Sequence, residues 1–245
     1  MTIEPLAPDP RIERALGYPY RIPEISFALH RGAVSVLEGA FETVDRVPVL
    51  ASGSNQSPDQ LKRKFGPDEP DPVISEAATL KDFDSVYSAH ITRYGSVAAT
   101  LWPSEGTLLP LFINWLTARQ LERMHETEAL GVNYRFGWLE GVEIETARGF
   151  KLDQAATYVS LAGALCLNNS PVALQALVAT RRLYPALDQA GVQDAIRQGL
   201  GHRGARADFI LGNIENPDNR KQTRQALAGR AQPFPLGIRA TNVRP

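Results

Sequence analysis

Closely spaced β-rich segments limit what this 245-residue chain can fold into more than any other feature of its sequence. Apolar and polar residues alternate in residues 83–92, a pattern typical of a strand with one buried face. Other β-rich or apolar runs of strand length lie before and after it, at residues 47–51, 96–102, 108–115, 134–139, 142–146 and 157–161. Only short helix signals interrupt this series. We therefore predict an α+β fold with a small, mostly closed β-sheet or barrel and short helices.

The helix signals within this region are local and specific. Ser57 can cap a helix, Pro58 suits its first turn and Gln60 follows at the third position after the cap, so a helix is expected to begin there. Thr117 and Gln120 form a second capping box. A second short helix is therefore expected after Thr117.

The character of the sequence changes after residue 167, and we predict three parts. Residues 1–45 are rich in proline and are expected to form an N-terminal arm that packs on the core. Residues 46–167 form the α+β domain. Residues 168–245 are expected to form a helical C-terminal extension that ends in an extended tail, with helices over 170–183 and 187–200.

Charge and composition narrow the possible partners. The net charge is −1, although residues 1–150 hold 14 Lys and Arg against 21 Asp and Glu while residues 151–245 hold 12 against 6. Such asymmetry is more typical of contacts between the two parts, or of solvated faces, than of a polynucleotide site. We expect no nucleic acid and no membrane as partner, and the sequence does not specify an oligomeric state.

The compartment is expected to be the cytoplasm. Cys166 is the only cysteine, so no disulfide can form within the chain. The first residues carry neither a basic start nor an apolar run of the kind a signal peptide needs. The longest apolar stretches fall well short of the ~18 residues of a membrane span.

Glu128 is the first candidate for chemistry. At about 100° per residue, it falls on the helix face defined by Leu121 and Met124. A carboxylate on an apolar face is costly to bury unless it is paired, and burial favours use as a general base. The alternative is a frayed helix end where Glu128 pairs with an arginine at the surface.

The loop Ser52-Gly53-Ser54-Asn55 is the second candidate. It lies between a predicted strand and a predicted helix start, where glycine permits close approach of a ligand and successive N–H groups can bind an anion. A plain turn is the alternative interpretation. The loop is neither a P-loop nor a dinucleotide fingerprint, because the required lysine and later glycines are missing.

Three stretches together resemble the gamma-glutamylcyclotransferase-like family over residues 47–165. Residues 49–61 resemble the family's strand-loop-helix opening, which contains an aromatic-Gly-Ser-Asn loop. Residues 94–103 look like its strand of small residues that ends in a proline. Residues 124–128, followed by Tyr134, fall where the family has Leu-Asp-x-x-Glu and then a tyrosine.

The resemblance implies a reaction and a site. The implied activity is metal-independent release of 5-oxoproline and an amine from a γ-glutamyl-type amide, without a cofactor. Glu128 corresponds to the family's catalytic glutamate. The implied substrate-binding residues are Ser52, Gly53, Ser54, Asn55 and Tyr134, of which Tyr134 is expected to orient Glu128 through its hydroxyl or else to be a tyrosine at the edge of the core.

The sequence also departs from the family, which keeps other hypotheses open. Ser52 replaces the usual aromatic residue, His125 the aspartate and Ala129 the glycine after the glutamate. A non-catalytic small-molecule-binding or regulatory module on the same fold is therefore the alternative. A related enzyme that acts on a different amide is a third possibility.

Other polar residues carry weaker signals. His90 with Ser88 could assist a nucleophile, but a hydrogen-bonded histidine in a sheet is the more ordinary interpretation. His125 lacks the second histidine that a zinc helix needs. Arg203 and Arg206 could bind an acidic partner or be solvated.

Overall fold

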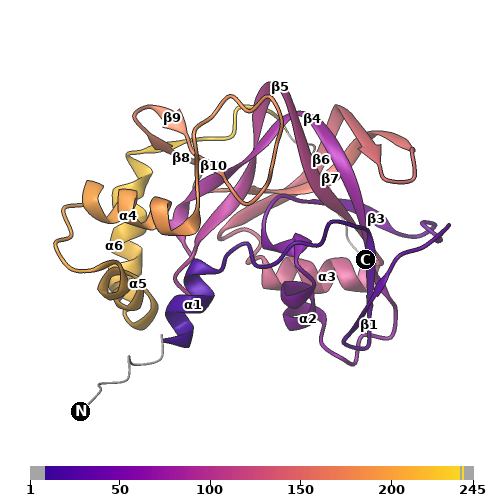
Figure 1. The fold of residues 1–245 in the computed structure, drawn as a ribbon, viewed down its shortest axis with the longest axis horizontal. Helices are drawn as coiled ribbons and strands as arrows, with labels where there is room; N and C mark the ends of the chain where they lie inside the picture. The colour runs from indigo at the N-terminus through magenta and orange to yellow at the C-terminus, as the bar shows by residue number, and fades with distance from the viewer. Residues whose placement is uncertain (1–8, 238, 240–245) are drawn as a thin grey trace, which may run out of the picture.

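The computed structural model describes residues 9–237 and 239, and it joins a closed β-sheet to a group of helices (Figure 1). The first residues of the predicted arm, 1–8, and most of the end of the predicted tail, 238 and 240–245, lie outside the described residues. The α-helices are α1 (Pro10–Leu16), α2 (Pro58–Phe65), α3 (Ala118–Thr127), α4 (Gln189–Gly199), α5 (Arg206–Glu215) and α6 (Pro217–Ala228). A short 3-10 helix, η1 (Ser54–Gln56), precedes α2.

The strands vary greatly in length. The longest ones are β3 (Val47–Ala51), β4 (Val73–Ile91), β5 (Val97–Leu116), β6 (Tyr134–Thr146) and β7 (Lys151–Ser160). The shorter ones are β1 (Phe27–His30), β2 (Ala33–Val36), β8 (Ala164–Leu167), β9 (Ser170–Pro171), β10 (Ala173–Leu174), β11 (Ala186–Leu187) and β12 (Ala231–Gln232).

The five long strands close into a ring in the order β4, β5, β3, β7, β6 and back to β4. All these pairings are antiparallel except β3 with β7, which is parallel. Closure removes the free edges that an open sheet would expose. The predicted α+β fold with a closed sheet and short helices is confirmed.

Strands that looked separate in the sequence are continuous. Residues 97–102 of the first predicted run and residues 108–115 belong to the single strand β5, and residues 134–139 and 142–146 belong to β6. The turn-like residues between them lie at irregularities of the sheet: Gly141 has a φ of +69° where the β6–β7 register shifts. A bulge bends a strand without ending it, which is why these positions resemble turns in the sequence.

Both predicted short helices are confirmed, at α2 and α3. Thr117 and Gln120 form the expected reciprocal capping box. Helix α2 begins at Pro58 as predicted, but Ser57 does not cap it through its side chain. The Ser57 side chain is buried and accepts no capping hydrogen bond.

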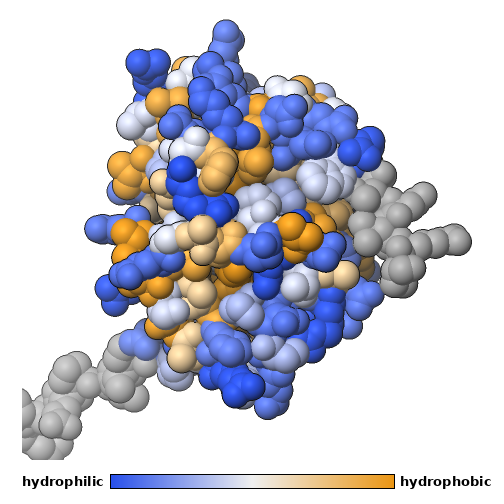
Figure 2. All heavy atoms as spheres, turned by 90° about the vertical axis from the view of Figure 1, so that its right-hand side faces the viewer, coloured by the Kyte–Doolittle hydropathy of each residue, from blue (hydrophilic) through white to orange (hydrophobic). Residues whose placement is uncertain are grey.

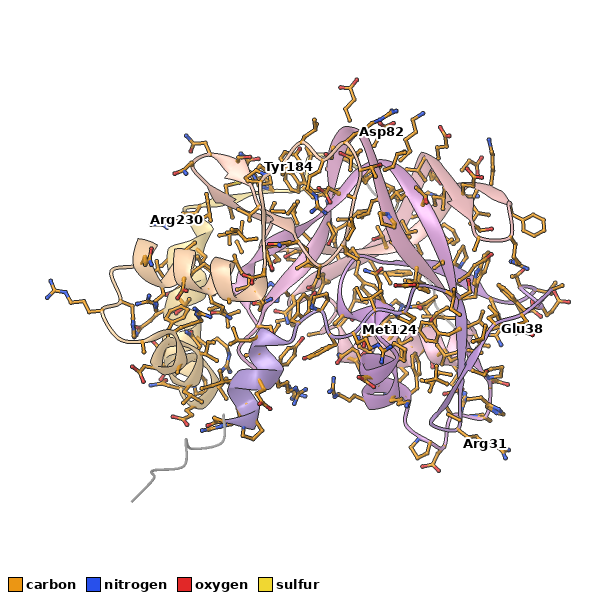
Figure 3. All side chains as sticks on the ribbon, in the orientation of Figure 1. Arg31, Glu38, Asp82, Met124, Tyr184 and Arg230 are labelled. Carbon is orange, nitrogen blue, oxygen red and sulfur yellow. The ribbon has the colours of Figure 1, made fainter. Side chains whose placement is uncertain are left out.

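Apolar side chains of α2 and α3 fix both helices against the outside of the sheet. Leu61, Leu121 and Met124 are at most 1% exposed and belong to one cluster with Phe112 and Tyr158. Figure 3 labels Met124 in the layer between the helices and the strands. The two helices also contact each other, so they form one unit beside the loop that precedes α2.

The helix predicted over residues 170–183 is wrong. This segment forms β9, β10 and irregular chain, and β10 pairs with β4 through Ala173 and Val86. Val172, Ala173 and Leu174 are consecutive and all buried, which a helix at a surface does not permit. The arginine that follows, Arg182, binds both carboxylate oxygens of buried Asp84.

The C-terminal helices lie together at one end of the molecule, beside α1 and away from α2 and α3 (Figure 1). The helix predicted over 187–200 is confirmed by α4. Helix α6 packs against β4, and α1 contacts both α4 and α5. This placement brings α1, from the N-terminal segment, to the same end of the molecule as α4 and α5.

Residues 25–44, within the predicted N-terminal arm, contain the hairpin β1–β2, and β1 continues the sheet by pairing with β4. On the face seen in Figure 2, hydrophobic residues form small groups between hydrophilic ones. None of the helices in the described part of the chain is long and apolar enough to cross a membrane.

Replacing Arg182 by Gln should destabilise the fold strongly, because it leaves the fully buried Asp84 carboxylate without its partner. Removing one partner of a buried pair costs about 3–5 kcal/mol, to be measured as the free energy of unfolding in urea at pH 7. Burial already raises the pKa of Asp84. The folded state therefore takes up this proton more readily than the unfolded state, and the loss should shrink as the pH falls.

Arg181→Gln is the matched control, since Arg181 is exposed and adjacent in sequence. Equal stability of the two variants at pH 7 would contradict a structural role for the Arg182–Asp84 pair.

Candidate functional site

A cavity of about 910 Å³ opens where α1, α2, α3 and α6 meet one end of the closed sheet. Its volume lies in the upper part of the range of about 300–1,000 Å³ typical of small-molecule sites. Its wall includes the loop of residues 52–55 and the turn between β4 and β5. Both sequence candidates, Glu128 and the loop, therefore line one cavity.

Glu128 caps the C-terminal end of α3, and its side chain is only 14% exposed. Its Oε1 accepts a hydrogen bond of 2.8 Å from Asn55 Nδ2, which joins the two candidates directly. The same oxygen pairs with the ammonium of Lys64. No other protein partner of the carboxylate occurs in the described residues, so Oε2 has none, and Glu128 lines the cavity.

Lys64 is the functional residue that the sequence reasoning missed. Its side chain is 5% exposed, and Nζ lies 3.3 Å from Met124 Sδ as well as against Glu128. A buried ammonium beside a buried carboxylate offsets part of the cost of removing both charges from water. Lys64 lies three residues after fully buried Leu61, so helix geometry places it on the buried face of α2, as it places Glu128 on the face of Leu121 and Met124.

The loop of residues 52–55 is held through its carbonyl groups. Ser85 Oγ donates to Ser52 O, Gln56 N donates to Gly53 O at 3.2 Å, and Asn114 Nδ2 donates to Asn55 O at 3.1 Å. All four residues of the loop line the cavity. The arrangement is a rigid rim rather than a plain surface turn.

Tyr18, from the N-terminal segment, lies against this rim. Its hydroxyl oxygen accepts a hydrogen bond of 2.9 Å from Ala99 N, and the backbone of Ser54 is also close enough to stabilise that oxygen. Burial raises the pKa of Tyr18 well above its usual value, so the hydroxyl keeps its proton at neutral pH. A Cβ on Gly53 would overlap the Tyr18 hydroxyl, which explains the need for glycine there.

The expectation that Tyr134 orients Glu128 through its hydroxyl is wrong. Tyr134 lines the cavity, but its hydroxyl donates to Ala99 O at 3.1 Å. Asn55, from the loop, and Lys64, from α2, hold the carboxylate instead.

The histidines singled out in the sequence have structural partners. His90 lies 2.8 Å from Ser88 Oγ through Nδ1 and does not line the cavity. Burial lowers the pKa of His90 to about 4, so the ring is neutral at pH 7. His125 Nδ1 lies 2.6 Å from the Tyr158 hydroxyl, and no group of three or more metal-ligating side chains occurs among residues 9–237 and 239.

Basic side chains dominate the charge of the cavity wall: its described residues include eight Lys and Arg against two Glu. Lys64 pairs with Glu128, and Arg123 pairs with the other glutamate, Glu126, at 2.8 Å. Arg203 is not part of the wall and Arg206 pairs with Asp194, so neither belongs to this site.

The sequence matches no protein-family model and no curated protein. Among solved structures, it is similar to a gamma-glutamyl cyclotransferase at 12% identity, over 80% of this chain and 94% of that one, with a TM-score of 0.39. An uncharacterised Homo sapiens protein is similar at 12% identity over 81% of this chain and 95% of its own, with a TM-score of 0.37. A protein from Arabidopsis thaliana is similar at 21% identity over 49% of this chain and 72% of its own, with the same TM-score. At these identities and TM-scores the matches assign no activity.

Lys64→Met should destabilise the protein, because it leaves Glu128 without its counter-charge. Since Glu128 is 14% exposed, the expected loss lies toward the low end of about 3–5 kcal/mol in the free energy of unfolding. Replacing both partners, as Lys64→Met with Glu128→Leu, should recover most of that loss. Lys62→Met on the same helix is the control, and a double variant no more stable than Lys64→Met would contradict the pairing.

Gly53→Ala should displace the Tyr18 ring and cost about 1–3 kcal/mol, as overpacking does. Tyr18→Phe removes the overlapping oxygen, so the same alanine should cost less in that background, measured as a double-mutant cycle. Gly229→Ala is the control, since the nearest atom to its added Cβ is 3.9 Å away. Strictly additive effects would argue against the contact.

Proposed function

We propose that the cavity binds a γ-glutamyl-type amide and releases 5-oxoproline and a free amine, with Glu128 as general acid and base. The observation that carries this proposal is the Glu128 carboxylate at the cavity wall, with Oε1 held by Asn55 and Lys64 and Oε2 without a protein partner in the described residues. The motif at residues 124–128, whose resemblance to the cyclotransferase pattern is given above, selects the same residue.

The reaction is one that positioning can accelerate. The free α-amine of the substrate attacks its own γ-carbonyl, a carbon–nitrogen bond closes the five-membered lactam, and the bond to the leaving amine breaks. Such intramolecular attack gains a large effective molarity when the ends are aligned. The chemistry requires neither a metal nor a covalent nucleophile, so orientation and proton transfer are the main contributions asked of the protein.

Glu128 would transfer the protons that the reaction requires. The attacking nitrogen begins as an ammonium and ends as a lactam N–H, so it loses two protons. The departing nitrogen gains two protons and leaves as an ammonium. A carboxylate that takes up each proton at Oε2 and passes it on balances the reaction, while Lys64 and Asn55 keep Oε1 in place.

The rim at residues 52–55 and Tyr18 would hold the polar groups of the substrate. The Tyr18 oxygen already accepts from Ala99 N, so its own proton is available to a carboxylate or to the oxyanion that develops on the γ-carbonyl. Ser52, Gly53, Ser54 and Asn55 line the cavity next to it and supply further N–H and hydroxyl groups, and Tyr134 contributes its ring to the wall.

Glu128→Gln should lower the rate of 5-oxoproline release by about 10²–10⁴-fold, the usual contribution of a general acid or base. The amide preserves size and the hydrogen-bonding position but accepts no proton. Glu126→Gln is the matched control, because Glu126 also lines the cavity two residues away on α3 but is 67% exposed. A panel of γ-glutamyl amides, with the product quantified by chromatography, is the assay. Retained turnover by Glu128→Gln would rule out this mechanism.

The second candidate is a binding module without turnover. It is favoured by one observation: both glutamates of the cavity already have a protein cation as partner. Stabilisation of the wild-type protein against heat by γ-glutamyl compounds, without any 5-oxoproline formed, would select this function over the enzyme.

A further inference from the structure

Six cationic side chains of the cavity have no acidic partner among the residues that the structure describes. Of the eight that line it, only Lys64 and Arg123 pair with its glutamates. Within residues 9–237 and 239, no carboxylate lies within 4.0 Å of any of the others, Arg14, Arg63, Arg93, Arg220, Lys221 and Arg224. Uncompensated charges of one sign in a concave site create a potential that attracts the opposite charge.

Most of these cations come from elements outside the rim and the α2–α3 pair. Helix α6 supplies Arg220, Lys221 and Arg224, and the β4–β5 turn supplies Arg93. Helix α6 packs against β4, and this contact places it at the cavity. Figure 1 shows α6 beside the sheet with the other C-terminal helices. The cavity therefore has two differently built parts. One contains Glu128 and the loop, and the other is a basic wall formed by Arg93, Arg220, Lys221 and Arg224.

Two of the arginines of the basic wall are held in place by the protein. Arg224 donates to Val132 O at 3.1 Å and to Asn133 Oδ1 at 3.2 Å, which ties α6 to the segment after α3. Arg220 donates to Asn213 O. The side chains of Arg93 and Lys221 are exposed and make no hydrogen bond or salt bridge in the described part of the chain, so no such contact accounts for their presence at the cavity.

A glutamyl group alone does not account for this wall. It carries a single carboxylate, which the rim and Tyr18 can hold, and it fills only part of a cavity of about 910 Å³. The remaining space is bordered by guanidinium and ammonium groups, which bind carboxylates and phosphates through charge-assisted hydrogen bonds. The part of the ligand that lies there should therefore be acidic.

We propose that the amine half of the substrate carries acid groups, either carboxylates or a phosphate, bound by Arg93, Lys221 and the arginines of α6. The proposal rests on the proposed function for the identity of the γ-glutamyl half. It assigns the C-terminal helix a role in selecting the leaving group, separate from the proton transfer at Glu128.

The test compares γ-glutamyl amides that differ in the charge of the amine. γ-Glutamylethanolamide is neutral in this half, γ-glutamylphosphoethanolamine carries a phosphate and γ-glutamylaspartate carries two carboxylates. We expect the acidic compounds to bind the wild-type protein at least about tenfold more tightly, as measured by calorimetry at low salt, and the tighter of the two identifies the acid group. Equal binding of all three compounds would overturn the proposal.

Arg93→Gln combined with Lys221→Gln should remove this preference. Both side chains are exposed, so the double variant should fold, and Lys151→Gln, at the exposed first residue of β7, is the matched control. For a compound that is turned over, the double variant should raise KM for the acidic amides about tenfold and leave kcat, and KM for the neutral amide, unchanged. A preference that survives in the double variant would overturn the proposal.

Binding and turnover separate this inference from the proposed function. Tight, salt-sensitive binding of the acidic amides that is lost in the double variant, without any 5-oxoproline, supports the anion site and refutes the enzymatic function. Release of 5-oxoproline with equal KM for acidic and neutral amides supports the function and refutes the anion site.

Discussion

The ion pair between Lys64 and Glu128 is the interaction on which the site depends. Each of two helices, distant in sequence, places one charge on the face that it buries against the sheet. Neither charge would be stable there alone, because removing a single ion from water costs several kcal/mol. The packing of α2 on the sheet and the packing of α3 on the sheet therefore depend on each other. The loop before α2 is coupled to both helices, because Asn55 binds the same oxygen of Glu128.

The closed sheet supplies the rigid frame for this arrangement. β3 leads directly into the loop at residues 52–55, and the sheet fixes that loop from two other strands, through Ser85 on β4 and Asn114 on β5. A site supported by several strands keeps its geometry better than one carried by a free loop. Tyr18 adds a contact from outside the ring, so part of the rim comes from a segment that precedes the sheet in the chain.

Local sequence signals predicted the elements whose capping residues and apolar periodicity are sufficient to specify them. They failed where tertiary contacts determine the secondary structure. The capping residues at Thr117 and Gln120 specify the start of α3 whatever surrounds it. Glu128 and Lys64 each follow from the angle of one helix, but the sequence does not say that the two faces meet. No local signal in residues 170–183 excludes a helix. The segment is extended there because Ala173 pairs with Val86 of β4. Tyr18 reaches the rim from 81 positions before its partner Ala99, a contact that no local pattern encodes.

The charge asymmetry between the halves of the chain has a structural explanation in two parts. Some of the basic excess after residue 150 neutralises acids of the first half, as Arg182 does for Asp84 and Arg239 for Glu140. Another part lies on α6 and faces a cavity whose own acids are already paired. Charged side chains that only keep a helix surface soluble could point in any direction away from the core. Because Arg220, Lys221 and Arg224 instead converge on one cavity, the basic character of the C-terminal region is better understood as complementarity to an anion than as surface composition.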